Sequence, residues 1–399
     1  MGMKQAWCRV YQWVFNIGEK LIPWNVPIRM DGVDSFKSIP DIIEQEEKKR
    51  PMVVTGPRIV KSDFLQELLS ELPEETVVFS EVTADPSITL VERIVEEYQS
   101  QECDCFIAVG GGSNMDAAKA AAARIARPDR TLQQLGGQLK VHHKTPLFIA
   151  VPTTAGTGSE TTIAAVVTDD TCGHKYAIND SVLVPDYAVL DPNLTVSLPP
   201  ALTASTGMDA LTHAVEAYLG WTYQTEETLK DAREATEAII EFLPIAYQEG
   251  NNLEAREEML VASFKAGVAF TRACVGNVHA IAHTIGGLYH VPHGLANAVV
   301  LPIVLEDYGA AAYKKLAQLA EVSQIMTEGT EEAKAKAFIA KIYQMNEDMG
   351  IPKTIDAIQR EDIPKMAAWA EAEANPLYPV PVVYSKKRFE AVIARVAGI

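Results

Sequence analysis

The sequence predicts two domains, the first an α/β domain with a parallel sheet and the second almost entirely helical. From residue 51 to about residue 194, short apolar runs alternate with longer amphipathic stretches. This alternation is typical of buried parallel strands with helices on both faces of their sheet. Beyond Asp191-Pro192 strand signals nearly vanish, and long segments with a 3.6-residue period follow. A chain of 399 residues also exceeds the length of an average single domain.

The domain boundary is expected beside Pro199-Pro200, with a first domain of residues 1–196 and a second of residues 197–399. In the first domain, buried apolar runs predict strands at 52–55, 76–79, 105–109 and 147–151. The stretches between them predict helices near 62–71, 87–100 and 114–126. β-branched residues and turn signals predict further strands over 161–189. In the second domain, periodic segments predict helices at 208–219, 227–242, 253–271 and 333–349.

Residues 1–21 form an N-terminal extension of the first domain. Apolar residues at helical spacing over 7–21, mixed with Arg9, Gln12 and Lys20, predict an amphipathic helix. The segment lacks the unbroken apolar core of a signal peptide, and its face is poor in the cations that favour a membrane surface. No stretch of the chain reaches the roughly 18 apolar residues of a membrane span. We therefore expect this helix to dock on the body of the protein or on a partner subunit, without a membrane.

The charge balance excludes partners that need a basic surface. Lys and Arg number 35 and Asp and Glu number 53, which gives a net charge of −18 at pH 7. Nucleic acids and anionic membranes both bind basic faces, so neither is an expected partner. The five cysteines form no regular framework, which predicts reduced thiols in a cytoplasmic protein. Cys103 and Cys105 have no second cysteine pair to complete a metal site, and Cys105 opens a run that predicts a buried strand.

Two loops at predicted strand ends have the composition of a ligand site. Gly110-Gly111-Gly112-Ser113 follows one strand and opens a helix, so backbone N–H groups and the positive end of the helix dipole face outward. A phosphate or pyrophosphate fits there, although Met115 stands where the usual dinucleotide fingerprint has a third glycine. Residues 152–160 follow the next strand with four hydroxyl residues and two glycines. Each loop alone is also explained as a tight turn, but together they favour ligand binding at a sheet edge.

Four of the eight histidines fall within fifteen residues of an otherwise apolar, glycine-rich segment: His279, His283, His290 and His293. Buried imidazoles need hydrogen bonds or a metal, and His279 and His283 share one helix face. Asp209 and His213 are also four residues apart in a helical pattern. Such a pair alone is more often a hydrogen-bonded surface pair. Beside the histidine segment, it favours a site for Fe(II), Zn(II) or a similar ion with a position open for substrate.

At these residues the chain resembles a known family. Segments 110–119 (GGGSNMDAAK), 151–160 (VPTTAGTGSE), 207–218 (GMDALTHAVEAY) and 279–297 resemble the iron-dependent, group III alcohol dehydrogenases. The resemblance extends from about residue 22 to the C-terminus and rests on four motifs in order. It implies a Rossmann-like dinucleotide-binding domain followed by a helical metal-binding domain, in an architecture like that of dehydroquinate synthase. A cleft between the domains is implied for cofactor and metal.

The resemblance also assigns roles to residues of this chain. It implies that Asp209, His213, His279 and His293 are the metal ligands, and that His283 lies near substrate and nicotinamide as a candidate proton relay. His290 has no family role. On the coenzyme side, it implies contacts from Gly111, Gly112 and Ser113 to the pyrophosphate and from Asp116 and Lys175 near the nicotinamide. It further implies adenine and ribose contacts from Thr153, Thr154, Thr157 and Thr162, and a coenzyme position at Asp85, where family members commonly have Asn.

The coenzyme preference is predicted from a departure at Gly56. Family members selective for NAD tend to have Asp there, which accepts the ribose hydroxyl and repels a 2′-phosphate. The glycine, with Arg58 and Lys61 nearby, favours NADP(H) over NAD(H). The alternative explanation of these three residues is a tight turn with solvent-exposed cations and no role in coenzyme binding.

The predicted activity is reversible hydride transfer between a small primary alcohol or aldehyde and NAD(P), with Fe(II), or alternatively Zn(II), as Lewis acid. We expect a homodimer or higher homo-oligomer. The alternatives are a zinc enzyme like dehydroquinate synthase or glycerol dehydrogenase, and a non-redox metallohydrolase or metal-binding regulator. A dehydroquinate-synthase-like lyase needs several basic residues for a phosphorylated substrate, and the segment 279–293 offers few. A metallohydrolase or a metal-binding regulator needs neither of the two loops, 110–113 and 152–160, that are rich in glycine or threonine.

Overall fold

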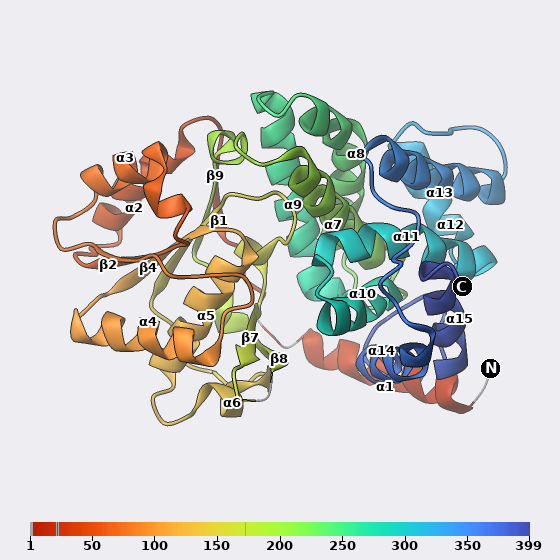
Figure 1. Ribbon diagram of the computed structural model, residues 1–399, viewed down its shortest axis with the longest axis horizontal. Coiled ribbons are helices and arrows are strands. Elements are labelled where there is room, and N and C mark those ends of the chain that lie inside the picture. Colours follow the sequence, from red (N-terminus) through yellow and green to blue (C-terminus); the bar gives the residue numbers. More distant parts are fainter. Residues whose placement is uncertain (1–2, 21, 23, 172) are drawn as a thin grey trace. The chain divides into compact units, whose positions relative to one another are not determined.

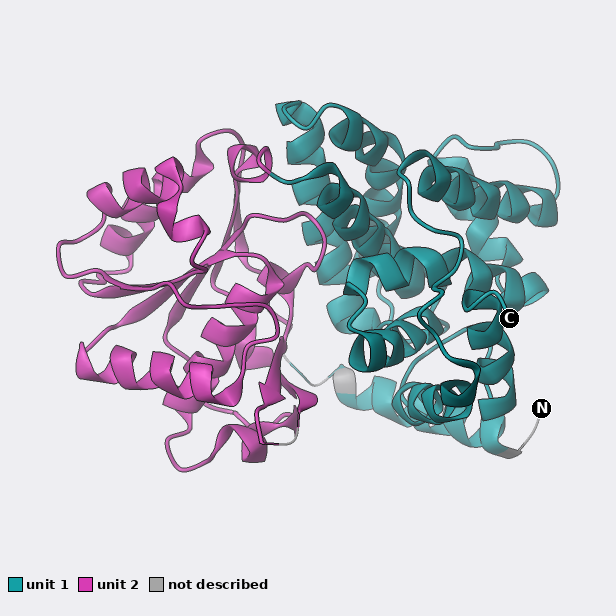
Figure 2. Cartoon of the chain, in the orientation of Figure 1, with its two compact units in different colours: residues 1–22, 198–399 teal, residues 23–197 magenta. Residues whose placement is uncertain are grey.

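The structure is a computed structural model that describes residues 3–20, 22, 24–171 and 173–399. The chain forms two compact units, one of residues 23–197 and one that joins residues 1–22 to residues 198–399 (Figure 2). The strands belong to the first unit, and the second is built from helices (Figure 1). The predicted fold class, an α/β domain followed by a helical domain, is confirmed.

The α/β unit contains a parallel sheet in the order β1-β9-β6-β4-β2-β3. Its strands are β1 (Ile28–Asp31), β2 (Pro51–Val54), β3 (Val77–Phe79), β4 (Cys105–Gly110), β6 (Leu147–Pro152) and β9 (Tyr187–Leu190). A smaller sheet, in the order β5-β8-β7, contains β5 (Gly137–Gln138), β7 (Ala164–Asp169) and β8 (His174–Asn179). The two predicted strands nearest the loops, 105–109 and 147–151, thus become β4 and β6, which pair in the centre of the main sheet.

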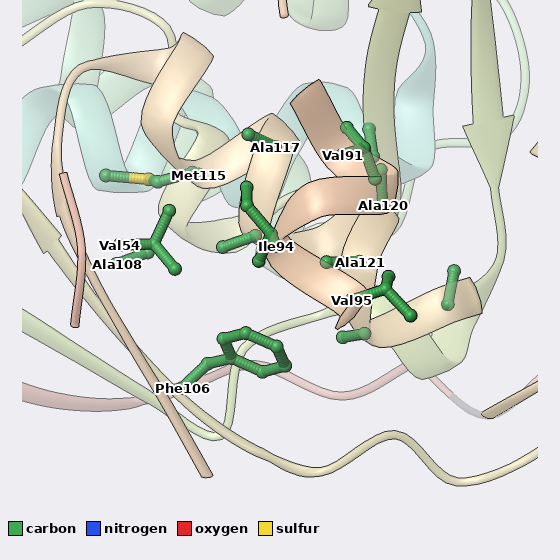
Figure 3. Packing of buried hydrophobic residues seen from close by; sticks show 14 of the residues in the cluster. Val54, Val91, Ile94, Val95, Phe106, Ala108, Met115, Ala117, Ala120 and Ala121 are labelled. Atoms are coloured by element: carbon green, nitrogen blue, oxygen red, sulfur yellow. The ribbon is translucent and has the colours of Figure 1, made fainter. Parts of the chain in front are cut away.

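Helices cover both faces of the main sheet because side chains alternate along each strand. Val54 of β2 and Phe106 of β4 pack against α4 (Ile88–Ser100) and α5 (Gly112–Ala126) (Figure 3). The neighbouring Val53 and Ile107 pack on the other side with α2 (Ile39–Gln45) and α3 (Asp63–Glu71). A short helix, α6 (Leu132–Leu135), precedes β5. Each of these strands is thus packed on both faces, and the loops begin at their carboxyl ends.

In the helical unit, α7 (Pro200–Leu219), α8 (Glu226–Gln248) and α9 (Leu253–Ala273) pack against one another. α11 (His293–Tyr308) lies against α7, and α10 (Asn277–Tyr289) lies against α11 and α14 (Ile363–Ala374). The remaining helices are α1 (Met3–Glu19), α12 (Tyr313–Val322), α13 (Glu331–Asp348) and α15 (Lys386–Val396). Side-chain caps begin several of these helices, as Thr225 does for α8 and Asn252 for α9. The contact of α7 with α11, and of α11 with α10, brings together the two predicted site segments of this unit, 207–218 and 279–297.

Helix α1 differs from its expected assignment to the first domain, because it packs on the helical unit. Gln12 Nε2 donates to the carbonyl oxygens of Pro376 and Tyr378, at 2.8 and 2.7 Å. Cys8 is buried in a small apolar cluster with Val380 and Val383. These contacts attach α1 to the segment that follows α14, which lies far away in the sequence. The amphipathic helix itself is confirmed, and so is its docking on the body.

Two further features concern the cysteines and the membrane. Cys8, Cys103 and Cys105 are free thiols, and Cys172 lies outside the described residues. Cys105 is fully buried at the start of β4, as the apolar run predicted. Within the described residues, no single helix is long and apolar enough to cross a membrane; α9 and α10 meet that criterion only as a pair, bent by 102°.

Candidate metal centre and coenzyme site

Asp209, His213, His279 and His293 come together in the helical unit. A ligand atom of each lies within 4.8 Å of those of the others. Asp209 and His213 are one turn apart on α7, His279 is in the first turn of α10, and His293 begins α11. The first three are buried, whereas the His293 side chain is 40% exposed. The cluster therefore has a protein-enclosed side and a side that a small molecule can reach.

The Asn297 amide marks the point on which the ligand atoms converge. Its Nδ2 lies 2.6 Å from Asp209 Oδ1, 3.2 Å from His279 Nε2 and 3.1 Å from His293 Nε2. The amide has two N–H groups for these three neighbours, so it can donate to Asp209 Oδ1 and to one of the two imidazoles. One carboxylate and three imidazoles form a donor set that suits Fe(II) or Zn(II). The residues present thus fit a divalent metal.

Glu216 of α7 orients His279. Its carboxylate accepts hydrogen bonds from His279 Nδ1 at 2.7 Å and from the backbone N–H groups of Gly276 and Val278 at 2.8 Å each. A Cβ at position 276 would lie 2.5 Å from Glu216 Oε1, so this close approach requires glycine. A carboxylate bound to Nδ1–H fixes the tautomer whose lone pair is on Nε2. Glu216 therefore caps the N-terminus of α10 and aims the His279 ring at the cluster.

Burial controls the charge states around this centre. It lowers the pKa of His279 well below the usual value, and the imidazoles of His213 and His293 lower it further. Neutral imidazole is the form that binds metals. Burial also raises the pKa of Asp209, and it raises that of Glu216 to about 7 despite the N–H groups that Glu216 accepts. A bound cation favours the ionised carboxylates, so the polar cluster and a metal would stabilise each other.

His283 lies beside the four-residue cluster with an exposed edge. Its ring centroid is 5.1 Å from that of His293 and 5.9 Å from that of His279, and its side chain is 44% exposed. His283 Nδ1 lies 2.7 Å from Glu373 Oε1, which also accepts the Tyr378 hydroxyl at 2.9 Å. Removal from water disfavours the charged ring, yet the carboxylates of Glu373, Asp209 and Glu216 together outweigh this effect and raise the pKa of His283. This imidazole can therefore hold a proton near neutral pH.

In the α/β unit, the two glycine-containing loops lie side by side at the carboxyl edge of the sheet. Gly110 of β4 pairs with Pro152 of β6, and the N–H of Thr153 donates to Gly110 O at 3.0 Å. Gly110 has a φ of +148°, and a Cβ there would lie 2.3 Å from Asn114 Oδ1, so the turn requires glycine. A Cβ on Gly112 would lie 3.1 Å from the Thr157 hydroxyl. The free N–H groups of α5 and the loop hydroxyls are thus brought together.

The second loop is anchored by Lys119 of α5, which is 1% exposed. Lys119 Nζ donates to Ser159 O at 2.5 Å, to Thr162 O at 2.7 Å and to the Thr162 hydroxyl at 3.0 Å. The Ser159 hydroxyl in turn donates to Asp116 Oδ1 at 3.2 Å. Burial lowers the pKa of Lys119, raises that of Asp116 and raises that of Glu160 to about 7. Thr162 and Asp116 therefore belong to a buried polar network behind the loop.

The remaining predicted coenzyme residues are also in the α/β unit. Gly56 is buried just after β2, while Arg58 and Lys61 are exposed. Asp85 has a φ of +57° and forms an ion pair with Lys175 of β8 at 2.7 Å. Gly111 precedes α5, and Ser113 lies in its first turn, where backbone N–H groups have no partner within the helix. A Cβ on Gly111 would lie 3.6 Å from Thr154 Oγ1, which places Thr154 beside that helix start.

Comparison with known proteins agrees with this geometry. The family model for iron-containing alcohol dehydrogenases matches residues 29–192, and the model for the C-terminal part of the Fe-containing alcohol dehydrogenase family matches residues 203–396. The chain belongs to the iron-containing alcohol dehydrogenases. It is accordingly an NAD(P)-dependent alcohol dehydrogenase that uses a metal, and the resemblance inferred from the motifs is confirmed.

The alignments with individual relatives extend over most of this chain. An NAD-dependent methanol dehydrogenase of Bacillus methanolicus is 34% identical over 347 residues, 86% of this chain and 91% of that protein. An NADPH-dependent butanol dehydrogenase of Clostridium saccharobutylicum is 37% identical over 314 residues, 77% of this chain and 80% of that protein. The crystal structure of a 1,3-propanediol oxidoreductase has a TM-score of 0.90 and 33% identity, and the match covers 94% of this chain and 99% of that one.

Glu216, Asn297 and Glu373 were not among the predicted site residues. Glu216 is three residues after His213 and seven after Asp209, which places all three on one helical face. Asn297 follows His293 by four residues, a similar signal. Glu373 is 90 residues from His283 along the chain, and no local pattern links them. Helical periodicity could thus have revealed two of these residues but not the third.

Proposed function

We propose that Asp209, His213, His279 and His293 bind one divalent metal, Fe(II) in the first place and Zn(II) as the alternative. The observation that carries this proposal is the convergence of their ligand atoms within 4.8 Å of one another. The orientation of His279 by Glu216 supports it, because ligating histidines commonly donate their second N–H to a carboxylate. When bound, the metal supplies a Lewis acid that polarises the oxygen of an alcohol or aldehyde. The donor set tolerates both metals, so metal supply decides occupancy.

The proposed reaction is reversible hydride transfer between a small primary alcohol and the nicotinamide ring. In oxidation the alcohol carbon gives a hydride to NAD(P)⁺, and the hydroxyl proton passes to His283 Nε2, which leaves an aldehyde. Glu373 accepts a hydrogen bond from the Nδ1–H group of His283, which leaves the lone pair on Nε2 to accept the hydroxyl proton. The exposed edge of His283 then returns the proton to water. Reduction of an aldehyde runs through the same steps in reverse.

For the coenzyme, the proposed pyrophosphate site is formed by Gly111, Gly112 and Ser113 at the start of α5. Thr153, Thr154 and Thr157 of the neighbouring loop are proposed as adenine and ribose contacts. Lys175, paired with Asp85, is proposed for the nicotinamide side. Asp116 and Thr162 act through the Lys119 network that shapes this loop. Support comes from the helix N-terminus, whose N–H groups and dipole favour a phosphate.

NADP(H) is proposed in preference to NAD(H). Residue 56 is glycine, so no carboxylate stands there to repel a 2′-phosphate, and Arg58 and Lys61 are exposed cations close by in sequence. The relatives include proteins named for either coenzyme, so the preference rests on these three residues. The test compares kcat/KM for NADPH and NADH in wild type and in the double variant Arg58→Ala/Lys61→Ala. Loss of charge-assisted phosphate contacts should lower the NADPH value by roughly 10- to 100-fold and leave that for NADH nearly unchanged.

The matched control for this experiment is Lys37→Ala, which removes an exposed cation from another part of the same unit. It should alter neither value. A clear preference of the wild type for NADH would contradict the NADP(H) proposal without affecting the metal site.

The activity itself is tested with protein loaded with Fe(II) or with Zn(II), by following nicotinamide absorbance with a panel of primary alcohols and aldehydes. Turnover should depend on the metal and disappear after chelation. His283→Ala should lower turnover with metal content intact, and His290→Ala, which changes a histidine at the end of α10, serves as its control. Loss of metal from His283→Ala would instead make His283 a ligand.

A further inference from the structure

Helix α1 packs Cys8, Gln12 and Phe15 against the helical unit, and it turns a second set of large apolar side chains toward solvent. Gln12 is fully buried and bonded to backbone carbonyls, and Arg9 donates to Val380 O at 2.8 Å. The opposite side is what we call the α1 apolar face, composed of Trp7, Val10, Trp13, Val14 and Ile17, which are 61, 55, 59, 55 and 48% exposed. An amphipathic helix usually has its apolar stripe on the core alone, whereas α1 carries these apolar residues on its solvent side as well. Patches of this kind on soluble proteins commonly mark interaction sites.

The spacing of the α1 apolar face fits another helix. Trp7, Val10, Val14 and Ile17 follow one another at intervals of three, four and three residues, which is the spacing of a coiled-coil seam. Trp13 lies beside that seam. From Trp7 to Ile17 the face carries no charge, because Arg9 is directed at the protein. Anionic lipid binding favours a cationic helix, so the composition points away from a membrane. The helix also precedes the family model, which begins at residue 29.

We propose that the α1 apolar face is a self-association surface on which the same face of a second copy of this chain packs. A two-fold contact needs a patch that complements itself, and an uncharged apolar seam does so without like-charge repulsion. The two tryptophans each leave roughly 100–150 Å² exposed, and two whole faces bring together on the order of 800 Å², below the usual ~1,200–2,000 Å² of a stable interface. The association is therefore weak, reversible and dependent on protein concentration.

The test is sedimentation velocity of the full chain over a series of protein concentrations, with wild type, Val10→Glu/Val14→Glu and Met326→Glu. Met326 is an exposed apolar residue elsewhere in the helical unit, so its variant controls for added surface charge. The weight-average mass of wild type and of Met326→Glu should rise with concentration, and this rise should be lost in Val10→Glu/Val14→Glu. Thermal unfolding and alcohol oxidation should match wild type in both variants, because the buried contacts of Gln12 remain.

Two results would overturn the proposal. The first is a mass that is independent of concentration, or that rises equally in wild type and in Val10→Glu/Val14→Glu. The second is co-sedimentation of wild type with phosphatidylcholine or phosphatidylserine vesicles that Val10→Glu/Val14→Glu abolishes, without self-association in their absence. That outcome would make the face lipid-binding. None of these readouts depends on the metal or coenzyme assignments.

Discussion

The metal cluster and the coenzyme loops are built in opposite ways. The cluster consists of side chains from α7, α10 and α11, most of them buried with Glu216, whose pKa is raised to about 7. The loops use mainly backbone N–H groups and hydroxyls at the ends of β4 and β6, shaped by Gly110 and anchored by Lys119. The first arrangement depends on charge inside a low-dielectric interior, and the second on backbone conformation. Substitutions should therefore act on metal retention in one unit and on coenzyme affinity or stability in the other.

The largest effect is expected from His279→Ala. It removes an imidazole from the cluster and leaves Glu216 without its ring partner, so metal content should fall sharply. Because a Lewis acid contributes several kcal/mol, turnover should fall about a thousandfold or more. Metal analysis and steady-state kinetics measure both. Retained metal with full turnover would show that the cluster is not the metal centre.

The next effect concerns stability in the α/β unit. Burial raises the pKa of Glu160 from 4.5 to about 7, so the folded state holds this proton more tightly than the unfolded state. The contribution of Glu160 to the free energy of unfolding should therefore fall as pH rises from about 4.5 to about 7, by up to about 3 kcal/mol. Glu160→Gln should raise the urea midpoint relative to wild type at pH 8, with the gain vanishing near pH 4. Glu102→Gln, at a highly exposed glutamate, should show no such pH-dependent gain.

Glu216→Gln tests the residue that accepts the hydrogen bond of the His279 ring, rather than a proposed metal ligand. An amide is a weaker acceptor for His279 Nδ1–H, and loss of such a partner lowers metal affinity by roughly 10- to 100-fold. Competition with a chelator measures this change. Glu371→Gln is the control, because that carboxylate pairs with Lys4 near the surface. Unchanged metal affinity in Glu216→Gln would show that Glu216 serves only to cap α10.

The smallest expected effect comes from Gly110→Ala. The positive φ and the contact with Asn114 Oδ1 should displace the turn, at a cost of about 1–2 kcal/mol. KM for the coenzyme should rise while metal content stays at the wild-type level. Gly287→Ala, where a Cβ meets nothing within 4 Å, is the control. Loss of metal from Gly110→Ala would contradict the separation of the two sites.

The predicted elements agree with the structure where local periodicity is strong. The run 105–109 became β4 and the segment 208–219 became the second half of α7, because burial follows directly from apolar spacing. The assignment of residues 1–21 failed, because amphipathicity shows that a helix docks but not on which surface. Its partners, the carbonyls of residues 376–381, carry no signature in the sequence.

The order of motifs along the chain was sufficient to determine the family and the α/β and helical division. The same motifs predict which residues meet a metal and a phosphate. Periodicity also places Asp209, His213 and Glu216 on one helix face, since that relation is local. Packing alone decided that Glu373 holds His283, that Lys119 anchors the loop around Thr162, and that Gln12 of α1 faces inward. Those contacts join residues far apart in sequence, and their energies come from burial, which exists only after the chain has folded.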